Sequence, residues 1–134
     1  MANLTIAAAD VHVAAFYEHL PDGPAAEAIN AGQPVRLDTA TGQYTLANAT
    51  NAAEARILGI ALNTAAVAET VSVLRKGLLN VGNALSAKAY DAAVYLSDTD
   101  GTLADTAGTV STVVGRVQPG FGSVTADKLL YVDL

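Results

Sequence analysis

The chain has 134 residues, which fits one domain that can fold on an apolar core without disulfides. It contains no cysteine, which excludes thiol chemistry and fits assembly in a reducing cytoplasm. The net charge is −6 and the seven basic residues are scattered, which argues against the basic surface that nucleic acids require. Although 51% of residues are apolar, no run reaches the roughly 18 residues of a membrane span, and no basic segment introduces a signal peptide.

The first 24 residues form an arm whose pattern indicates neither a clean helix nor a clean strand. The turn signal PDGP ends it, so we divide the chain into an arm, residues 1–24, and a β-rich domain, residues 25–134. Three states of the arm stay open: disorder, a core strand, or an extension onto a neighbouring subunit. For the third state the candidate contacts are the apolar residues of the arm: Leu4, Ile6, Val11, Val13 and Phe16.

The first half of the domain is predicted to be mostly strand, with two short helical turns. Residues 25–30 suit one helical turn, and residues 51–55 suit another with Asn51 as its N-cap. Residues 57–62 predict an apolar strand that contains Gly59. A glycine inside a strand often marks a bulge or a close backbone approach.

The rest of the chain continues the pattern of short strands between turns. Strands are predicted at residues 70–76 and, as a separate short element between two glycines, at residues 78–81. Residues 86–92 suit a turn, and further strands are predicted at 110–118 and 128–134. Short strands at this spacing predict an all-β fold, a compact β-sandwich or a barrel-like domain, with the N-terminal arm added to it.

The two halves of the domain repeat one another. Residues 35–42 and 94–101 share an alternating segment with the same step from valine to glycine. Three further pairs follow in the same order: Thr45 with Thr102, Gly59 with Gly115, and Val71 with Leu129. The offsets are nearly constant (94−35=59, 102−45=57, 115−59=56, 129−71=58). We therefore predict an internal pseudo-repeat with halves at about residues 33–76 and 93–134.

No motif predicts a catalytic, cofactor or metal site. Residues 98–101 (DTDG) resemble the start of a calcium loop, but no glutamate follows Glu69 to complete it. We interpret them as a polar hairpin turn whose aspartates bond nearby backbone amides. His12 and His19 lack the spacing of a helical zinc pair, and no nucleophile elbow or phosphate loop is present.

A few residues of the domain are candidates for contacts with other proteins. Arg75 and Lys76 form the only adjacent basic pair, which suits either a solvated strand end or an acidic patch on a partner. Tyr90, Tyr95 and Tyr131 are expected to point outward, and exposed tyrosines are enriched in interfaces. Packing at a strand edge is the alternative for these tyrosines. We take Arg75, Lys76 and Tyr95 as candidate contacts.

Four segments carry a pattern of strands and glycines: residues 31–38 (AGQPVRLD), 59–62 (GIAL), 70–73 (TVSV), and 93–96 (AVYL) with Gly101. This pattern resembles the small capsid cement, or head decoration, proteins of tailed bacteriophages. The resemblance covers roughly residues 28–134. The chain departs from the family pattern at residues 68–70 (AET), where a glycine is common, and in its longer N-terminal arm.

The resemblance implies a β-rich, non-catalytic protein that binds the outer surface of an assembled capsid and stabilises its capsomers against the pressure of packed DNA. The implied partners are the major capsid protein and further copies of the chain, as a homotrimer, with no cofactor, nucleic acid or membrane. The protein would be made in the host cytoplasm and reside in the virion. Two alternatives stay open: another β-rich virion part, such as a head spike base or tail protein, and a carbohydrate- or calcium-binding β module.

Overall fold

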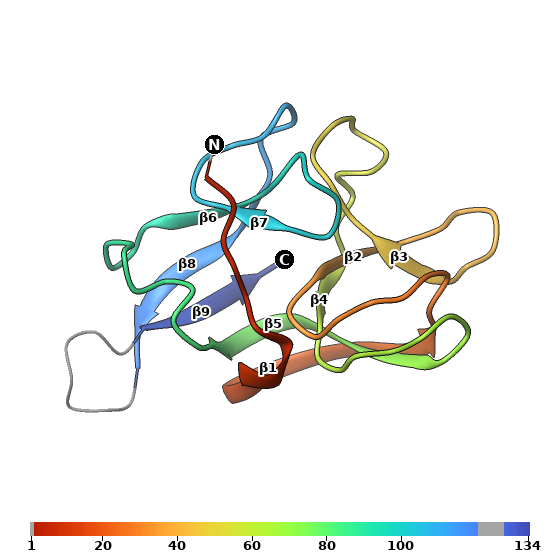
Figure 1. Ribbon diagram of the computed structural model, residues 1–134, viewed down its shortest axis with the longest axis horizontal. Helices are drawn as coiled ribbons and strands as arrows, with labels where there is room; N and C mark the ends of the chain where they lie inside the picture. Colours follow the sequence, from red (N-terminus) through yellow and green to blue (C-terminus); the bar gives the residue numbers. More distant parts are fainter. Residues whose placement is uncertain (1, 121–127) are drawn as a thin grey trace.

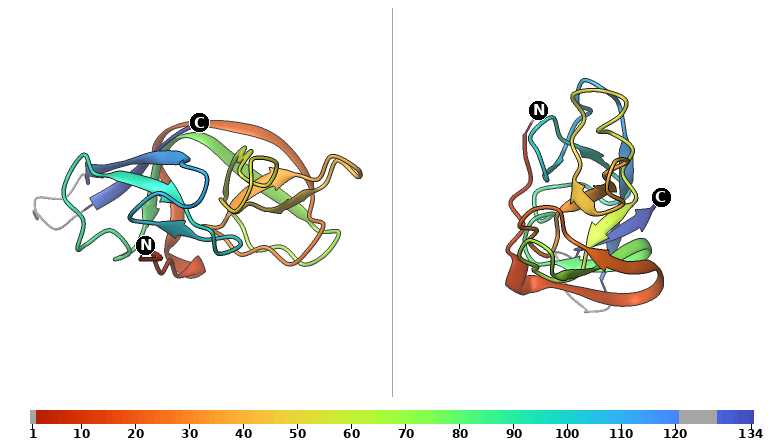
Figure 2. Two further views of the ribbon diagram at one scale, coloured as in Figure 1. Left: turned by 90° about the horizontal axis from the view of Figure 1, so that it is seen from above. Right: turned by 90° about the vertical axis from the view of Figure 1, so that its right-hand side faces the viewer.

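The computed structural model describes residues 2–120 and 128–134, except for the side chain of Phe16. The described residues form nine strands and one turn of 3-10 helix. All strand pairings are antiparallel, and the single sheet curls into a half-barrel (Figures 1 and 2). The prediction of an all-β, barrel-like domain is therefore confirmed. No helix in the described part is long and apolar enough to cross a membrane.

The strands occupy the following positions along the chain. The short helix η1 (Ala8–Asp10) precedes β1 (Val11–Pro24), β2 (Pro34–Leu37), β3 (Tyr44–Leu46), β4 (Gly59–Ala61), β5 (Thr70–Val81), β6 (Ala93–Leu96), β7 (Leu103–Ala104), β8 (Val113–Pro119) and β9 (Lys128–Asp133). The order in the sheet is β3-β2-β4-β5-β9-β8-β6-β7, and β1 pairs with β5 outside this path.

The two halves of the sheet have the same strand order. The sequence β3-β2-β4-β5 in the first half corresponds to β7-β6-β8-β9 in the second, with β5 and β9 adjacent at the centre. Gly59 of β4 lies opposite Val35, and Gly115 of β8 lies opposite Val94. The internal pseudo-repeat is thus a feature of the fold, and the two glycines hold the same place in it.

Both glycines allow the next strand to approach closely. A Cβ atom at Gly59 would lie 2.3 Å from the carbonyl oxygen of Leu74, and one at Gly115 would lie 2.0 Å from that of Tyr131. Cβ atoms do not tolerate such distances to backbone oxygens, so only glycine fits without a shift of the strands. The glycine inside each predicted strand therefore marks a close backbone approach.

The strand pairings correct the alignment of the second sequence block. Leu37 of β2 pairs with Tyr44, and Leu96 of β6 pairs with Leu103. Both steps give an offset of 59 (96−37 and 103−44), so Leu103 corresponds to Tyr44 and not to Leu46 as the sequence comparison predicted. The predicted block is shifted by two residues because β3 and β7 are too short to carry a distinctive pattern.

The fourth block is shifted by one residue. Ile60 of β4 pairs with Leu74, and Arg116 of β8 pairs with Tyr131. Tyr131 therefore corresponds to Leu74, at an offset of 57, and not to Val73. A one-residue slip exchanges the two faces of a strand, so the predicted match compared inward residues with outward ones.

Local structure departs from the sequence prediction in two places. Residues 70–81 form one continuous strand, so the predicted break at Gly77 (φ 145°) is wrong. Residues 25–30 form no helical turn, because Ile29 exchanges backbone hydrogen bonds of 2.9 and 2.8 Å with Ala65. The predicted turn at 51–55 is present: the Ala55 amide donates to the carbonyl oxygen of Asn51 (3.0 Å).

The core consists of two clusters of buried side chains. The larger cluster is shared by both halves and includes Leu74, Leu79, Leu96 and Leu130. The smaller cluster belongs to the first half, where the fully buried Ile29 closes it from the segment before β2. Alternating strand residues supply most of both clusters, as the period of a half-buried strand requires.

Candidate functional site

The apolar residues of the N-terminal arm lie against the chain's own core. Leu4, Ile6, Val11 and Val13 are partly buried and pack against the larger cluster. Residues 11–24 form β1, which runs antiparallel along β5. Of the three states left open for residues 1–24, β1 therefore takes that of a core strand, because its apolar side chains gain burial within the chain. The side chain of Phe16 lies outside the described part.

The beginning of the arm is held by the second half of the sheet. The Ala2 amide donates to Asp105 Oδ1 (2.8 Å), and Ser97 Oγ donates to Asn3 Oδ1 (2.6 Å). The hydrogen bond from the Ala2 amide lowers the pKa of Asp105 below its ordinary value. These contacts join residues about 100 positions apart in the sequence, so the described arm is a built part of the domain.

Arg75 and Lys76 are both paired with carboxylates of neighbouring strands. Arg75 donates to Glu18 Oε1 of β1 (2.8 Å), and Lys76 Nζ lies 3.3 Å from Asp133 Oδ1 of β9. The contact with Asp133 raises the pKa of Lys76. Both predicted contact residues remain exposed, but their charges are already partly neutralised by the same chain.

The structure separates the third predicted contact, Tyr95, from the basic pair. Tyr95 is half-buried on β6, and β8 and β9 lie between β6 and β5 in the sheet. Tyr17 and Tyr131 lie closer to the pair, where they line a shallow hollow of about 310 Å³ with Glu18 and Lys76. Sequence reasoning missed Tyr17 because the arm around it shows no clear strand pattern from which an outward direction could be predicted.

Five large apolar residues are exposed on the described surface, at 41–64% of their area. They are Tyr17, Leu37, Val67, Tyr90 and Val113. Val67 lies in the connection between β4 and β5, and Tyr90 lies in the connection between β5 and β6. These two connections are at opposite ends of the long axis (Figure 1). Of these five residues, only Tyr90 was predicted to be exposed. Val67 could have been predicted as well, because it is the single large apolar residue in the connection of small residues at 64–69.

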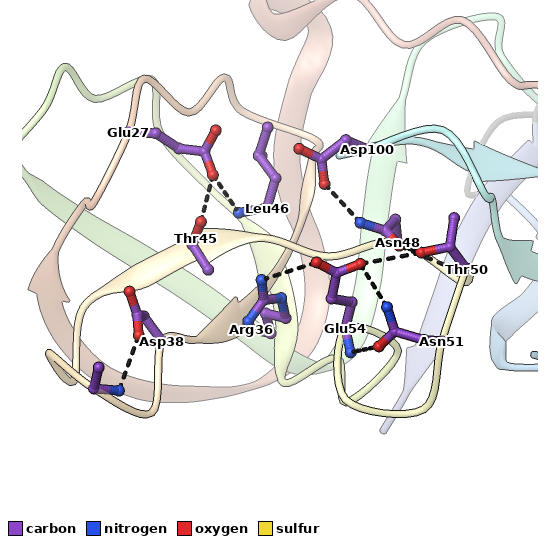
Figure 3. Close-up of polar contacts among 11 residues, drawn as sticks. Glu27, Arg36, Asp38, Thr45, Leu46, Asn48, Thr50, Asn51, Glu54 and Asp100 are labelled. Carbon is purple, nitrogen blue, oxygen red and sulfur yellow. Dashed lines mark hydrogen bonds and ion pairs between the residues drawn. The ribbon is translucent and has the colours of Figure 1, made fainter.

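A polar network joins the strands of the first half to the loop that follows them (Figure 3). Thr50 Oγ1 and Asn51 Nδ2 each donate to Glu54 Oε2 at 3.0 Å, and these hydrogen bonds lower the pKa of Glu54. On the strand side, the hydroxyl of the buried Thr45 donates to Glu27, which also accepts from the Leu46 amide (3.2 Å). The carboxylates thus hold turns in place, which is a structural use.

The aspartates of the DTDG turn have structural partners, but only Asp98 accepts a backbone amide as predicted. Asp98 Oδ1 accepts the backbone amide of Thr109 (2.8 Å) and its Oδ2 accepts the Thr109 hydroxyl (2.8 Å). Asp100 Oδ1 accepts the side-chain amide of Asn48 from the first half (3.1 Å). Among the described residues, no group of three or more His, Cys, Asp or Glu side chains could hold a metal ion.

Comparisons of the chain with protein-family models, with curated proteins and with solved structures each give no match. The resemblance to phage cement proteins therefore stays a prediction from the sequence pattern.

Proposed function

We propose that this protein is a structural virion component that binds the outer surface of a phage capsid and holds neighbouring capsomers together. The sequence pattern of residues 31–38, 59–62, 70–73 and 93–96 with Gly101 motivates this proposal. The partners in this proposal are the major capsid protein and further copies of the chain, most simply in a trimer, and no catalytic step is involved.

The observation that carries the proposal is the distribution of exposed apolar residues. Val67 and Tyr90 belong to the connections before and after β5, which are at opposite ends of the long axis. Tyr17 lies on β1, beside the middle of β5. A cement protein has to touch more than one capsid subunit. Several weak contacts on a fixed lattice then act together, because each contact raises the effective concentration of the others.

The use of the polar residues supports the same proposal. Glu54, Asp98 and Asp105 accept hydrogen bonds from the chain's own turns and arm. An enzyme site instead directs several polar groups towards a shared pocket. A rigid module with internally satisfied carboxylates suits a protein whose task is to present a fixed surface.

Sedimentation with capsids tests the proposal. Expanded capsids assembled from the major capsid protein of the same genome are mixed with the purified protein and pelleted. We expect the protein in the pellet, saturating at a fixed ratio to the capsid subunit, and a higher temperature of capsid disruption. Light scattering of the free protein measures whether it is a trimer before binding.

Two outcomes would contradict the proposal in different ways. Failure to pellet with expanded capsids at micromolar protein excludes a cement role. Pelleting with isolated tails, and not with capsids, would favour a tail component. Unexpanded capsids serve as the control, since a protein that recognises the mature lattice should bind them more weakly.

A further inference from the structure

A pocket of about 220 Å³ opens beside β2 and the loop that precedes β4. Its lining residues are Arg36, Leu37, Thr39, Ala53, Arg56 and Leu58. Two of the seven basic residues of this acidic chain therefore line one small pocket. We name it the arginine pocket.

Arg56 differs from the other basic residues in having no polar partner in the described structure. Five of the seven are engaged: Arg75 with Glu18, Lys76 with Asp133, Arg116 with Asp91, Lys88 with the Asp105 carbonyl, and Lys128 with carbonyl oxygens of residues 86 and 88. Arg56 is exposed, and no hydrogen bond or ion pair of its guanidinium is formed with a described residue. Its charge is therefore available to a ligand.

Arg36 is only partly satisfied. Its Nε is buried and has no hydrogen-bond partner in the described structure. Its guanidinium lies 3.8 Å from Glu54 Oε1, which is an ion-pair distance without a hydrogen bond (Figure 3). The other oxygen of Glu54 is already occupied by Thr50 and Asn51. The Arg36 side chain is still 23% exposed, so a ligand can contact it there, although the buried Nε itself is out of reach.

The remaining lining selects the class of ligand. Leu37, Ala53 and Leu58 provide an apolar wall, which suits a carboxylate carried on a short aliphatic stem. A planar guanidinium matches the two oxygens of a carboxylate. Phosphate is disfavoured, because the net charge of −6 and the nearby carboxylate of Glu54 oppose a more highly charged group.

We propose that the arginine pocket binds a glutamate or aspartate side chain presented by a partner protein. The identity of that partner as the capsid subunit rests on the function proposed above. The pocket would then fix the orientation of the module on its partner, because one acidic side chain is recognised by two guanidinium groups from different segments.

A titration followed by nuclear magnetic resonance tests the pocket without a capsid. The probe is N-acetyl-glutamate N-methylamide, and its uncharged match is the corresponding glutamine derivative. We expect the glutamate compound to shift the backbone amide signals of Leu37, Thr39, Ala53 and Leu58, and the glutamine compound to leave them unchanged. R56Q should weaken binding at least about tenfold, because a charge-assisted hydrogen bond is lost.

The matched control is R75Q, which removes an exposed arginine that is paired with Glu18 outside the pocket. It should bind the glutamate compound as the unaltered protein does. Equal shifts with both compounds, or equal affinity of R56Q and R75Q, would overturn the carboxylate site. Tighter binding of inorganic phosphate than of the glutamate compound would overturn the choice of ligand.

Capsid sedimentation of R56E and R116E tests the partner, since Arg116 is an exposed arginine outside the pocket that is paired with Asp91. We expect R56E to lose at least about tenfold in affinity for the capsid, while R116E pellets as the unaltered protein does. Full pelleting of R56E would overturn the assignment of the pocket to the capsid contact. If the unaltered protein itself fails to pellet, the proposed function fails, while the titration still decides whether the pocket binds carboxylates.

Discussion

The turns that follow β2 and β6 hold equivalent positions but have opposite surroundings. Gly42 and Gly101 are 59 residues apart, and both have a positive φ, of 71° and 63°. A Cβ atom at Gly42 would meet nothing within 4 Å, whereas one at Gly101 would lie 2.9 Å from both Gln33 Nε2 and Leu46 Cδ2. The first turn projects from the domain, and the second packs against the other half.

The same difference appears in the strands that lead into these turns. Leu37 ends β2 and is 41% exposed, whereas its equivalent Leu96 ends β6 and is fully buried. The repeated sequence thus specifies the strand and the turn. Whether their side chains are buried depends on the contacts that each copy makes with the other half. The uncovered copy is the one that lines the arginine pocket.

Alanine at the two strand glycines should have the largest effect, and it tests whether Gly59 and Gly115 hold equivalent positions in the two halves. We expect G59A and G115A each to lower the free energy of unfolding by about 3 kcal/mol, because the added methyl group would overlap a backbone oxygen of the next strand. Urea unfolding measures both losses. A loss below about 1 kcal/mol in one variant only would show that the two positions are not equivalent.

Alanine at the two turn glycines, Gly42 and Gly101, should lower the stability by different amounts in the two halves. We expect G42A to cost about 1 kcal/mol, since only the positive φ opposes a side chain there. G101A should cost up to about 1 kcal/mol more, because the ends of the Gln33 and Leu46 side chains have to move aside as well. Thermal and urea unfolding of the two variants give the difference directly, and equal losses would contradict the different packing of the turns.

Alanine at Asp98 should cost about 1 kcal/mol, because the Thr109 amide and hydroxyl lose their acceptor. The equivalent residue in the first half is Thr39 (98−59=39), which is exposed in the projecting turn. T39A is therefore the matched control, with little expected effect on unfolding. Calcium binding at micromolar affinity that D98A abolishes would instead indicate a metal site, and calorimetry would detect it.

Acid should act on the first half through Glu54, whose carboxylate accepts hydrogen bonds from Thr50 and Asn51. The lowered pKa of Glu54 means that its contribution to folding is present above the ordinary value of 4.5 and is lost as the pH falls through the folded value. The stability difference between the unaltered protein and E54Q should therefore be largest near neutral pH and shrink below pH 4.5. A difference independent of pH would contradict this origin.

The β pattern could be predicted because alternating residues and strand glycines are local signals. Gly59 and Gly115 lie within runs of apolar residues, and the close approach that they permit depends on one neighbouring strand. The register of β3 could not be predicted, since a shift of two residues keeps the same side chains on each face and leaves the alternation unchanged. The arm was equally unreadable, because the four register shifts along β1 interrupt its alternation.

The arginine pocket had no local signal in the sequence. Arg36 and Arg56 are 20 residues apart, on a strand and in an irregular loop, and neither belongs to a motif. Only the fold shows that five of the seven basic side chains are engaged elsewhere. Sequence reasoning selected Arg75 and Lys76 because they are adjacent, yet adjacency carries no information about which charges are already paired.

The contacts of residues 2–4 have a consequence for the kinetics of folding. The Leu4 amide donates to the carbonyl oxygen of Leu103 (2.9 Å), and the Asp105 amide donates to that of Ala2 (3.0 Å). During synthesis, Ala2 and Leu4 cannot form these hydrogen bonds until Leu103 and Asp105 have left the ribosome. Contacts between segments so far apart in the sequence are typical of all-β folds, which fold in roughly milliseconds to seconds. The late docking of the arm leaves β7 as an open edge in the nascent chain, where a second chain could pair in its place.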